Sequence, residues 1–326
     1  MERLAIKENL SIANIVKVNG LEINEIAYNP AVIIDEINDK KDIILALRVE
    51  DKNSYWLGNI YNPHIRFFKY EQGVLNPLIG APVFEMHEDA FATWFMDKGK
   101  IRLLFGAVFV EKTDKANPQV TTRFYTADNI FELSPSSKPI AIIHDMKDIR
   151  LVQDPENQKF LVLTRPTKGE EFNEGRIGLI TIDKLSDLND ENVNRARILP
   201  IKGIKTEDKI GSNEVHYLSE NGNPKLLVYG HIAKSDGPDW EKDCLHYRAM
   251  RFIFDPYDSQ NKEIIPEIIL STKMVQGHGA GKYPRTTDVV FTGGKGVQFD
   301  EKLVPNLMFY GIGDNSIAVG QEPNFS

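Results

Sequence analysis

The sequence lacks the residue patterns that mark disulfide-rich, zinc-cluster and membrane proteins. Its 326 residues include one cysteine, Cys244, which excludes an intramolecular disulfide and a cysteine-based zinc cluster. No apolar run approaches the length of a membrane span. The N-terminus, MERLAIKENLSIANIVKVNG, has neither the apolar core nor the cleavage site of a signal peptide. We therefore expect a cytoplasmic protein, and nothing in the sequence requires a metal.

An excess of positive charge is also missing. The chain has 39 Lys and Arg against 47 Asp and Glu, a net charge of −8. This balance argues against nucleic acid and anionic membrane as partners, because both need clustered basic residues. With 41% hydrophobic and 26% charged residues, the composition is typical of a soluble globular protein. Small-molecule partners are expected, and the sequence leaves open whether the chain forms a homo-oligomer.

Strong helical patterns are scarce as well, and short apolar runs separated by Gly, Asn, Asp and Pro take their place. Many short strands with turn signals between them indicate an all-β fold. A degenerate repeat of about 50 residues, the size of a four-stranded propeller blade, favours a propeller. We predict a five-bladed β-propeller as a single domain over 1–326, with 1–25 packing on it or closing it. The repeats cover 29–70, 86–131, 146–188, 209–257 and 286–319.

The acidic pair Glu88-Asp89 leads into the apolar strand pattern of 91–96, and a second apolar strand pattern follows at 101–110. Carboxylates at this position face desolvation, which raises the pKa of at least one member of a close pair. A raised pKa makes a carboxyl usable as a general acid near neutral pH. The alternative is an aspartate that only caps a turn. In a propeller, the polar starts of the inner strands would bring distant clusters of this kind to one funnel.

Five short motifs, one in each repeat, resemble those of a known enzyme family. The chain resembles the five-bladed β-mannoside phosphorylases of glycoside hydrolase family 130, and more closely their relatives, the dual-activity β-1,2-mannosyltransferase/phosphorylases. The segments that carry the resemblance are Asn29-Pro30-Ala31 with 45–49, His87-Glu88-Asp89-Ala90, Lys147-Asp148-Ile149 with 164–166, Lys209-Ile210-Gly211 with 228–231, and 288–291 with 309–314.

The resemblance implies an inverting displacement at a β-mannoside. Asp89 would be the general acid, and inorganic phosphate would attack the anomeric carbon to give α-mannose 1-phosphate. The reverse reaction would build β-mannosides, with the β-1,2 linkage that the resemblance implies. It would need no cofactor besides phosphate as co-substrate. Sugar-binding residues would be Asn29, Arg48, Glu88, Lys147, Asp148 and Asp314. Phosphate-binding residues would be Arg150, Arg165, Lys209, His231 and Arg285, whose side chains supply cationic or imidazole donors.

Two other functions stay open at this point. An inverting hydrolase of the same fold would need a second carboxylate as base, a part that Asp148 or Asp314 could take. A non-catalytic propeller that binds glycans is the other alternative. The chain departs from the family at Phe91, where the family has an arginine, and at Asp145, where the phosphorylases are basic. Trp240, in a polar loop, is predicted to stack on a sugar.

Overall fold

The protein is built almost entirely of β-strands. The computed structural model describes residues 6–37, 40–53, 62–111, 120–166, 175–205, 207–220, 222–237, 243–258, 262–279, 281–296 and 306–324. Within these ranges the helices are the single turn α1 (Asp190–Val193) and four 3₁₀ turns, at Ile130–Glu132, Leu185–Asp187, Thr272–Met274 and Pro284–Thr286. None of the helices in the described ranges is long and apolar enough to span a membrane. The prediction of an all-β fold is confirmed.

The described strands form four hydrogen-bonded sheets, of four, four, five and ten strands. The ten-stranded sheet is joined at β2, which pairs with β23 on one side and with β6 on the other, and we describe its two antiparallel parts as separate units, which gives five units in all. In four of the units, strands that follow one another in sequence pair with one another. These four units consist of β3 (Glu25–Ile37), β4 (Lys40–Asp51), β5 (His64–Glu71) and β6 (Val74–Pro77); β8 (His87–Asp97), β9 (Lys100–Val110), β10 (Val120–Ala127) and β11 (Ala141–His144); β12 (Arg150–Gln153), β13 (Phe160–Thr164), β14 (Gly178–Ile182) and β15 (Arg197–Ile198); and β16 (Lys209–Glu220), β17 (Asn223–Ser235), β18 (Leu245–Phe254) and β19 (Glu267–Leu270).

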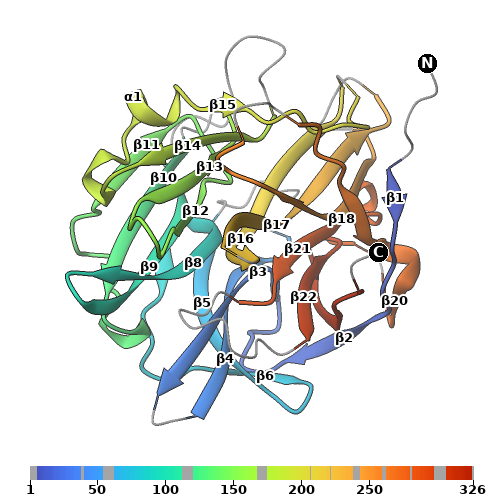
Figure 1. Ribbon diagram of the computed structural model, residues 1–326. Coiled ribbons are helices and arrows are strands. Elements are labelled where there is room, and N and C mark those ends of the chain that lie inside the picture. The colour runs from blue at the N-terminus through green and yellow to red at the C-terminus, as the bar shows by residue number, and fades with distance from the viewer. Residues whose placement is uncertain are drawn as a thin grey trace.

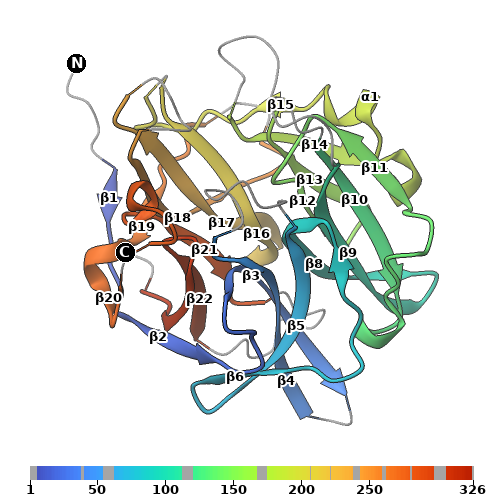
Figure 2. The same ribbon diagram turned by 180° about the vertical axis from the view of Figure 1, so that it is seen from behind.

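The fifth unit combines the two ends of the chain. Strands β21 (Val290–Gly294), β22 (Leu307–Ile312) and β23 (Ser316–Gln321) are completed by β2 (Ala13–Val18), which pairs antiparallel with β23. The end of β2 also pairs with β6 (Figure 1), and β1 (Lys7–Glu8) pairs with β19 (Figure 2). The short strands β7 (Phe84–Glu85) and β20 (Val275–Gln276) pair with β5 and β2. The N-terminal segment therefore contacts the first, fourth and fifth units.

The first strands of the five units meet at the centre of the molecule. Strand β3 contacts β8, β8 contacts β12, β12 contacts β16, β16 contacts β21, and β21 contacts β3. Figures 1 and 2 show these strands in the middle of the molecule, with the later strands of each unit further out. Side chains that leave the inner strands at the same level therefore face one another, although they lie far apart in sequence.

Five apolar clusters fill the space between neighbouring units, including the space between the last unit and the first. Phe67 packs with Phe105 between the first and second units, and Phe68 packs with Phe309 between the first and fifth. The other three clusters join the second unit to the third, the third to the fourth, and the fourth to the fifth. Each unit is thus covered on both faces, which explains why strands such as 101–110 read as nearly continuous apolar runs.

An extra residue interrupts the ladder in four of the five inner strands. Asn29, Asp89, Asn213 and Gly293 lie at register shifts in β3, β8, β16 and β21. Such β-bulges turn a side chain out of the regular alternation. Asn29 and Asp89 adopt left-handed backbone angles, with φ of 47° and 50°, which Asn and Asp tolerate better than most residues. The bulges therefore release polar side chains toward the centre while the rest of each strand keeps its apolar packing.

Arg251 of β18 joins the fourth unit to the C-terminal segment. Its side chain is 1% exposed and lies 2.9 Å from the Glu267 carboxylate and 3.2 Å from that of Glu322. It also donates hydrogen bonds to the backbone carbonyls of Pro323 and Asn324. The arginine therefore neutralises two largely buried carboxylates and supplies hydrogen-bond donors to the last backbone carbonyls of the described chain.

We predict that Arg251→Met lowers the free energy of unfolding by about 3 kcal/mol, because Glu267 and Glu322 lose a buried counter-charge. The pairs that these carboxylates keep, with Lys7 and Lys295, are weaker or more exposed. Denaturant unfolding measures the loss. The matched control is Lys159→Met, which removes an exposed ion pair with Asp183 and should change stability by less than about 1 kcal/mol. Equal, small losses in both variants would contradict the role given to Arg251.

Candidate active site

Asp89 lies at the bulge in β8, at the centre of the molecule. Its Oδ1 accepts a hydrogen bond of 3.0 Å from Asn29 Nδ2 and lies 3.5 Å from Arg48 Nη1. Burial raises the pKa of the Asp89 carboxyl and Glu88 raises it further, whereas Arg48, Lys147 and the Asn29 hydrogen bond act in the opposite direction. The net pKa is above the ordinary value, and the side chain is still 14% exposed. Asp89 can therefore hold a proton and remain within reach of a ligand.

Glu88 holds two cations beside this carboxyl. Its side chain is 5% exposed and lies 2.7 Å from Lys147 Nζ and 3.1 Å from Arg48 Nη2. Lys147 comes from the loop before β12, so residues of the first three units meet here. We call Asn29, Arg48, Glu88, Asp89 and Lys147 the acid group. The alternation of β8 at its bulge explains how two consecutive carboxylates both contribute to one site.

Asp148 starts a second group, although it follows Lys147 directly. Its carboxylate lies 2.7 Å from Arg165 Nη1 and 4.0 Å from both Arg150 Nη2 and His231 Nε2. Burial alone would raise the pKa of Asp148, but Arg165, His231 and Arg150 together hold it below its ordinary value. Asp148 is therefore ionised at neutral pH, and it lies beside two guanidinium groups, of Arg150 and Arg165, and the imidazole of His231.

The second group contains buried donors that lack an acceptor. Arg150 is 1% exposed and uses two of its nitrogens to bind the backbone carbonyls of Asn213 and Ile149. Its Nη2, the Arg165 Nε and the Asn213 Nδ2 are buried and have no hydrogen-bond partner within the described ranges. A buried donor without an acceptor is costly, and charged donors of this kind suit an anion. We call Asp148, Arg150, Arg165, Asn213 and His231 the cation group.

Close packing fixes the imidazole of His231 in the cation group. Its Nδ1 lies 2.8 Å from Asn213 Oδ1, and its ring stacks on Tyr247 at 5.3 Å with 7° between the planes. A Cβ added at Gly211 would lie 2.6 Å from the imidazole and 2.4 Å from Asp148, so glycine is required for this approach. Burial lowers the pKa of His231 to about 4, against the effect of Asp148. The ring is therefore neutral at neutral pH.

Tyr247 lies between the two groups. Burial raises the pKa of its phenol to about 12, and the phenol is also affected by Arg165, Asp314, Asp148 and Asp89. Neither Tyr247 nor Asn213 was among the residues that the sequence singled out. Asn213 carried a weak signal, since it is a polar residue directly after the motif Lys209-Ile210-Gly211. Tyr247 gave none, because an aromatic residue in a strand is ordinary core material.

Asp314 joins the acid group from the turn between β22 and β23, with a left-handed φ of 51°. Burial raises its pKa to about 6, Glu50 and Asp89 add to this effect, and Arg48 and Lys282 oppose it. Both Asp89 and Asp314 thus have raised pKa values, and each affects the other through its charge. The turn after β22 places this carboxyl on the side of the first unit.

The remaining predicted residues lie around these groups. Lys209 begins β16, two residues before Gly211, and its half-buried side chain packs against Gly175. Arg285 lies in the 3₁₀ turn before β21, with its guanidinium 5.8 Å from the Tyr283 ring centre. Trp240, predicted to stack on a sugar, lies outside the described residues.

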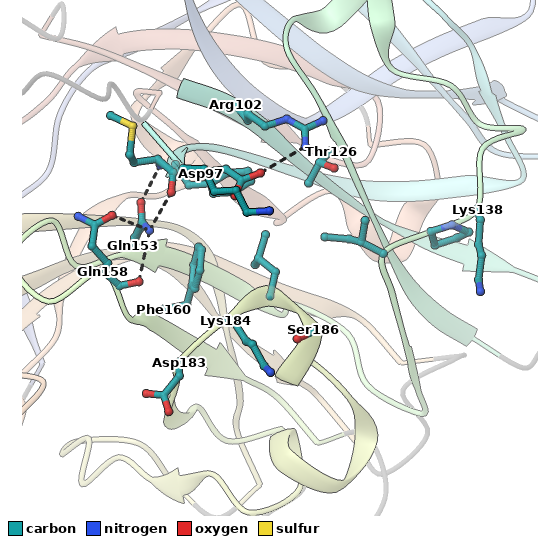
Figure 3. A pocket seen from close by; sticks show the side chains of 16 residues that line it. Asp97, Arg102, Thr126, Lys138, Gln153, Gln158, Phe160, Asp183, Lys184 and Ser186 are labelled. Atoms are coloured by element: carbon teal, nitrogen blue, oxygen red, sulfur yellow. Dashed lines mark hydrogen bonds and ion pairs between the residues drawn. The ribbon is translucent and has the colours of Figure 1, made fainter. Parts of the chain in front are cut away.

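A separate hollow lies between the outer parts of the second and third units. It has a volume of about 730 Å³, and its lining includes Arg102, Lys138, Gln153 and Lys184 (Figure 3). Gln153 bonds to the backbone of Met96 on its floor. None of the residues predicted for the site lines this hollow. We therefore place the candidate site by its buried charges and not by the size of a surface depression.

Three solved structures with a similar fold have descriptions that name mannose or mannosides. MPT-4, a mannose phosphorylase from Leishmania mexicana in complex with a phosphate ion, has 20% identity and a TM-score of 0.74 over 97% of this chain and 89% of its own. MPT-1, a GDP-Man-dependent mannosyltransferase from the same organism, has 23% identity and a TM-score of 0.70 over 98% and 91%.

A third similar structure comes from the GH130 family of mannoside phosphorylases, described as containing glycoside hydrolases that target β-1,2-mannosidic linkages in Candida mannan. It has 13% identity and a TM-score of 0.58 over 97% of this chain and 95% of its own. At these identities the comparison shows a shared fold. The family resemblance noted from the five motifs is confirmed at that level.

The sequence itself matches one protein family. No curated protein matches it. The model of the family described as "Protein of unknown function (DUF1861)" matches residues 4–319. Because this match covers nearly the whole chain, the protein belongs to the DUF1861 family.

Proposed function

We propose that this protein is a five-bladed β-propeller enzyme that transfers a mannosyl residue between a β-mannoside and inorganic phosphate with inversion. The closed cycle of inner strands and the five apolar clusters between neighbouring units support the blade count. The observation that carries the reaction is the juxtaposition of a protonatable buried carboxyl with buried donors that lack an acceptor. An acid and an anion site are the two parts that phosphorolysis needs.

In the direction of cleavage, Asp89 supplies a proton to the departing glycosidic oxygen, through the 3-hydroxyl of the sugar in enzymes of the family it resembles. A phosphate oxygen attacks the anomeric carbon from the opposite face while the glycosidic C–O bond breaks. The products are α-mannose 1-phosphate and the shortened mannoside. In the reverse direction, phosphate leaves and an acceptor hydroxyl returns its proton to Asp89. The enzyme needs no redox or metal step for this exchange.

The two groups divide the work between them. Asn29, Arg48, Glu88, Lys147 and Asp314 hold mannosyl hydroxyls around Asp89, and Asp148 does so from the cation group. Arg150, Arg165, Asn213 and His231 bind phosphate through the donors that face the same centre. Lys209 and Arg285 complete the anion site from its edge when substrate is bound. Because Asp148 neutralises part of the cation group, the site attracts an anion without a large excess of buried positive charge.

The substrate is proposed by analogy and by chemistry together. The similar MPT-4 structure is described with a phosphate ion, and MPT-1 is described as dependent on GDP-Man. The β-1,2 linkage is suggested by the motifs and by the description of the GH130 structure. We favour inorganic phosphate over a nucleotide sugar because Arg150, Asn213 and His231 are 1%, 5% and 3% exposed, which suits a small anion.

Inverting hydrolysis is the second candidate, and one observation favours it. The pKa of Asp148 is held below its ordinary value, so this residue is a carboxylate that could act as base toward a water. An inverting hydrolase requires such a second carboxylate at a distance that admits the water. Phosphorolysis releases mannose 1-phosphate whereas hydrolysis releases free mannose, so product analysis distinguishes the two reactions.

We predict that incubation with β-1,2-mannobiose yields mannose 1-phosphate when phosphate is present and no product when it is absent. Anion-exchange chromatography and ³¹P NMR detect the phosphate ester. Release of free mannose at the same rate in both incubations would identify a hydrolase. Binding of the disaccharide without turnover in either incubation would identify a glycan-binding propeller.

Asp89→Asn should lower kcat by about 10²–10⁴-fold, the usual contribution of a general acid, with an unchanged circular dichroism spectrum and unfolding midpoint. The acid must be protonated to act, so wild-type activity should fall as the pH rises through the pKa of Asp89, which lies above its ordinary value. Glu85→Gln, at an exposed position of the short strand β7, is the control. Ordinary activity in Asp89→Asn would remove the acid from the mechanism.

Arg165→Lys should raise the KM for phosphate by about tenfold or more, because lysine lacks the planar fork that binds phosphate through two hydrogen bonds. The KM for the mannoside should change less. Arg248→Lys, whose arginine pairs with Asp288 at 2.7 Å, is the matched control. Initial rates measured at varied phosphate concentrations give these KM values. Equal changes in the KM for phosphate and for the mannoside would indicate that Arg165 has a structural role and does not bind phosphate.

A further inference from the structure

A buried lysine outside the predicted site is linked to the acid group. Lys282 lies in the segment before β21, and its side chain is only 2% exposed. Its Nζ pairs with the carboxylate of Glu50, which is fully buried in β4. The two residues are separated by 232 positions in sequence. A buried ion pair is costly to form, so its position beside the site calls for an explanation.

Glu50 is shared among three donors. It accepts a hydrogen bond from the Tyr28 hydroxyl, pairs with Lys282, and lies 3.7 Å from Arg48 Nη2. The same guanidinium lies 3.1 Å from Glu88 and 3.5 Å from Asp89, above the Tyr28 ring at 4.9 Å. Arg48 is therefore attracted both by Glu50 and by the pair Glu88 and Asp89. Lys282 neutralises the carboxylate on the side away from Asp89.

The backbone holds Lys282 firmly in this position. Its N–H donates to the carbonyl of Gly313 at 2.7 Å, and the Thr286 hydroxyl donates to the same carbonyl. A Cβ at Gly313 would lie 2.8 Å from Gly281 Cα, so the segment 281–286 packs directly on the turn that carries Asp314. Lys282 and Asp314 therefore keep a constant relation to each other and to Arg48.

The charges around Asp89 nearly balance. Four carboxyls lie around the acid, namely Glu50, Glu88, Asp89 and Asp314, and three cations accompany them, namely Arg48, Lys147 and Lys282. Asn29 and Tyr28 are neutral hydrogen-bond donors. Tyr247 and Arg150 belong to the neighbouring side of the site, where the cation group lies. Four carboxyls and three cations become neutral when one proton is bound. Without Lys282, Glu50 would compete for Arg48 and the surroundings of Asp89 would become more negative.

We propose that Lys282 is a positioning residue for the acid: by neutralising Glu50 it keeps Arg48 on Glu88 and Asp89, and it thereby sets how readily Asp89 gives up its proton. This inference rests on the proposed function for its catalytic meaning, since Asp89 is the general acid only if that function is correct. The contacts among Lys282, Glu50 and Arg48 do not depend on it.

Lys282→Met is the test variant. Without Lys282, Glu50 draws Arg48 away from Asp89, and Asp89 loses part of the positive charge that lowers its pKa. The basic limb of the pH–kcat profile should therefore move about one unit upward. The kcat itself should fall about tenfold because Arg48 is displaced. Lys282→Arg keeps the charge and should leave the limb in place. The double variant Glu50→Gln/Lys282→Met removes both charges and should return the limb toward its wild-type position.

A stabilising role alone would give a different result. The control Lys295→Met removes another partly buried ion pair, with Glu322 at 2.8 Å, and should lower the unfolding midpoint without moving the limb. The proposal is overturned if Lys282→Met lowers the unfolding midpoint without moving the basic limb of the pH–kcat profile. It is also overturned if the double variant Glu50→Gln/Lys282→Met shows the same upward shift of that limb as Lys282→Met alone.

A second measurement is independent of turnover. Side-chain carboxyl NMR, with the Asp89 resonance assigned through Asp89→Asn, follows the titration of Asp89 in the wild type and in Lys282→Met. The titration midpoint should rise in the variant even if the protein has no activity on mannosides. Absence of wild-type turnover would defeat the proposed function, whereas an unchanged midpoint would defeat the role of Lys282.

Discussion

The need to balance charge at a buried centre governs this structure. Glu88 is almost fully buried and stands between Lys147 and Arg48, and Asp148 stands among Arg165, Arg150 and His231. Charges taken out of water are stable only when partners and hydrogen bonds replace the solvent. The partners here come from different units, so the inner strands must be held in a fixed arrangement before the charges can be satisfied.

The outer parts of the molecule supply that fixed arrangement. Apolar clusters between neighbouring units bury both faces of each sheet, and β2 joins the N-terminal segment to β23. The Arg251 network holds the other end of the described chain. The rigidity of the surroundings allows polar side chains at the bulges to keep positions that solvent would otherwise loosen.

The two charged groups have opposite properties because their surroundings differ. Asp89 lies beside Glu88 and its pKa is raised, whereas Asp148 lies beside three basic residues and its pKa is lowered. Neighbouring carboxyls with divergent pKa values are typical of sites where one group carries a proton and another remains charged. Consecutive residues in the sequence, Lys147 and Asp148, serve the two groups separately, because the backbone turns at Asp148, which has a left-handed φ of 52°, just before β12 begins at Arg150.

The sequence by itself determined the strand content, the order of the repeats and the polar residues at the inner strands, because alternation, turn residues and isolated charges in apolar surroundings are local features. It led to Glu88 and Asp89 in this way, and the resemblance of the five motifs to a known family added Arg48, Lys147, Asp148 and Arg165. Only the tertiary structure decided which charges meet. Tyr247, Asn213 and the Lys282–Glu50 pair carried little or no local signal, since their roles arise from contacts between units, and a residue's pKa depends on neighbours that the chain brings together only when it folds.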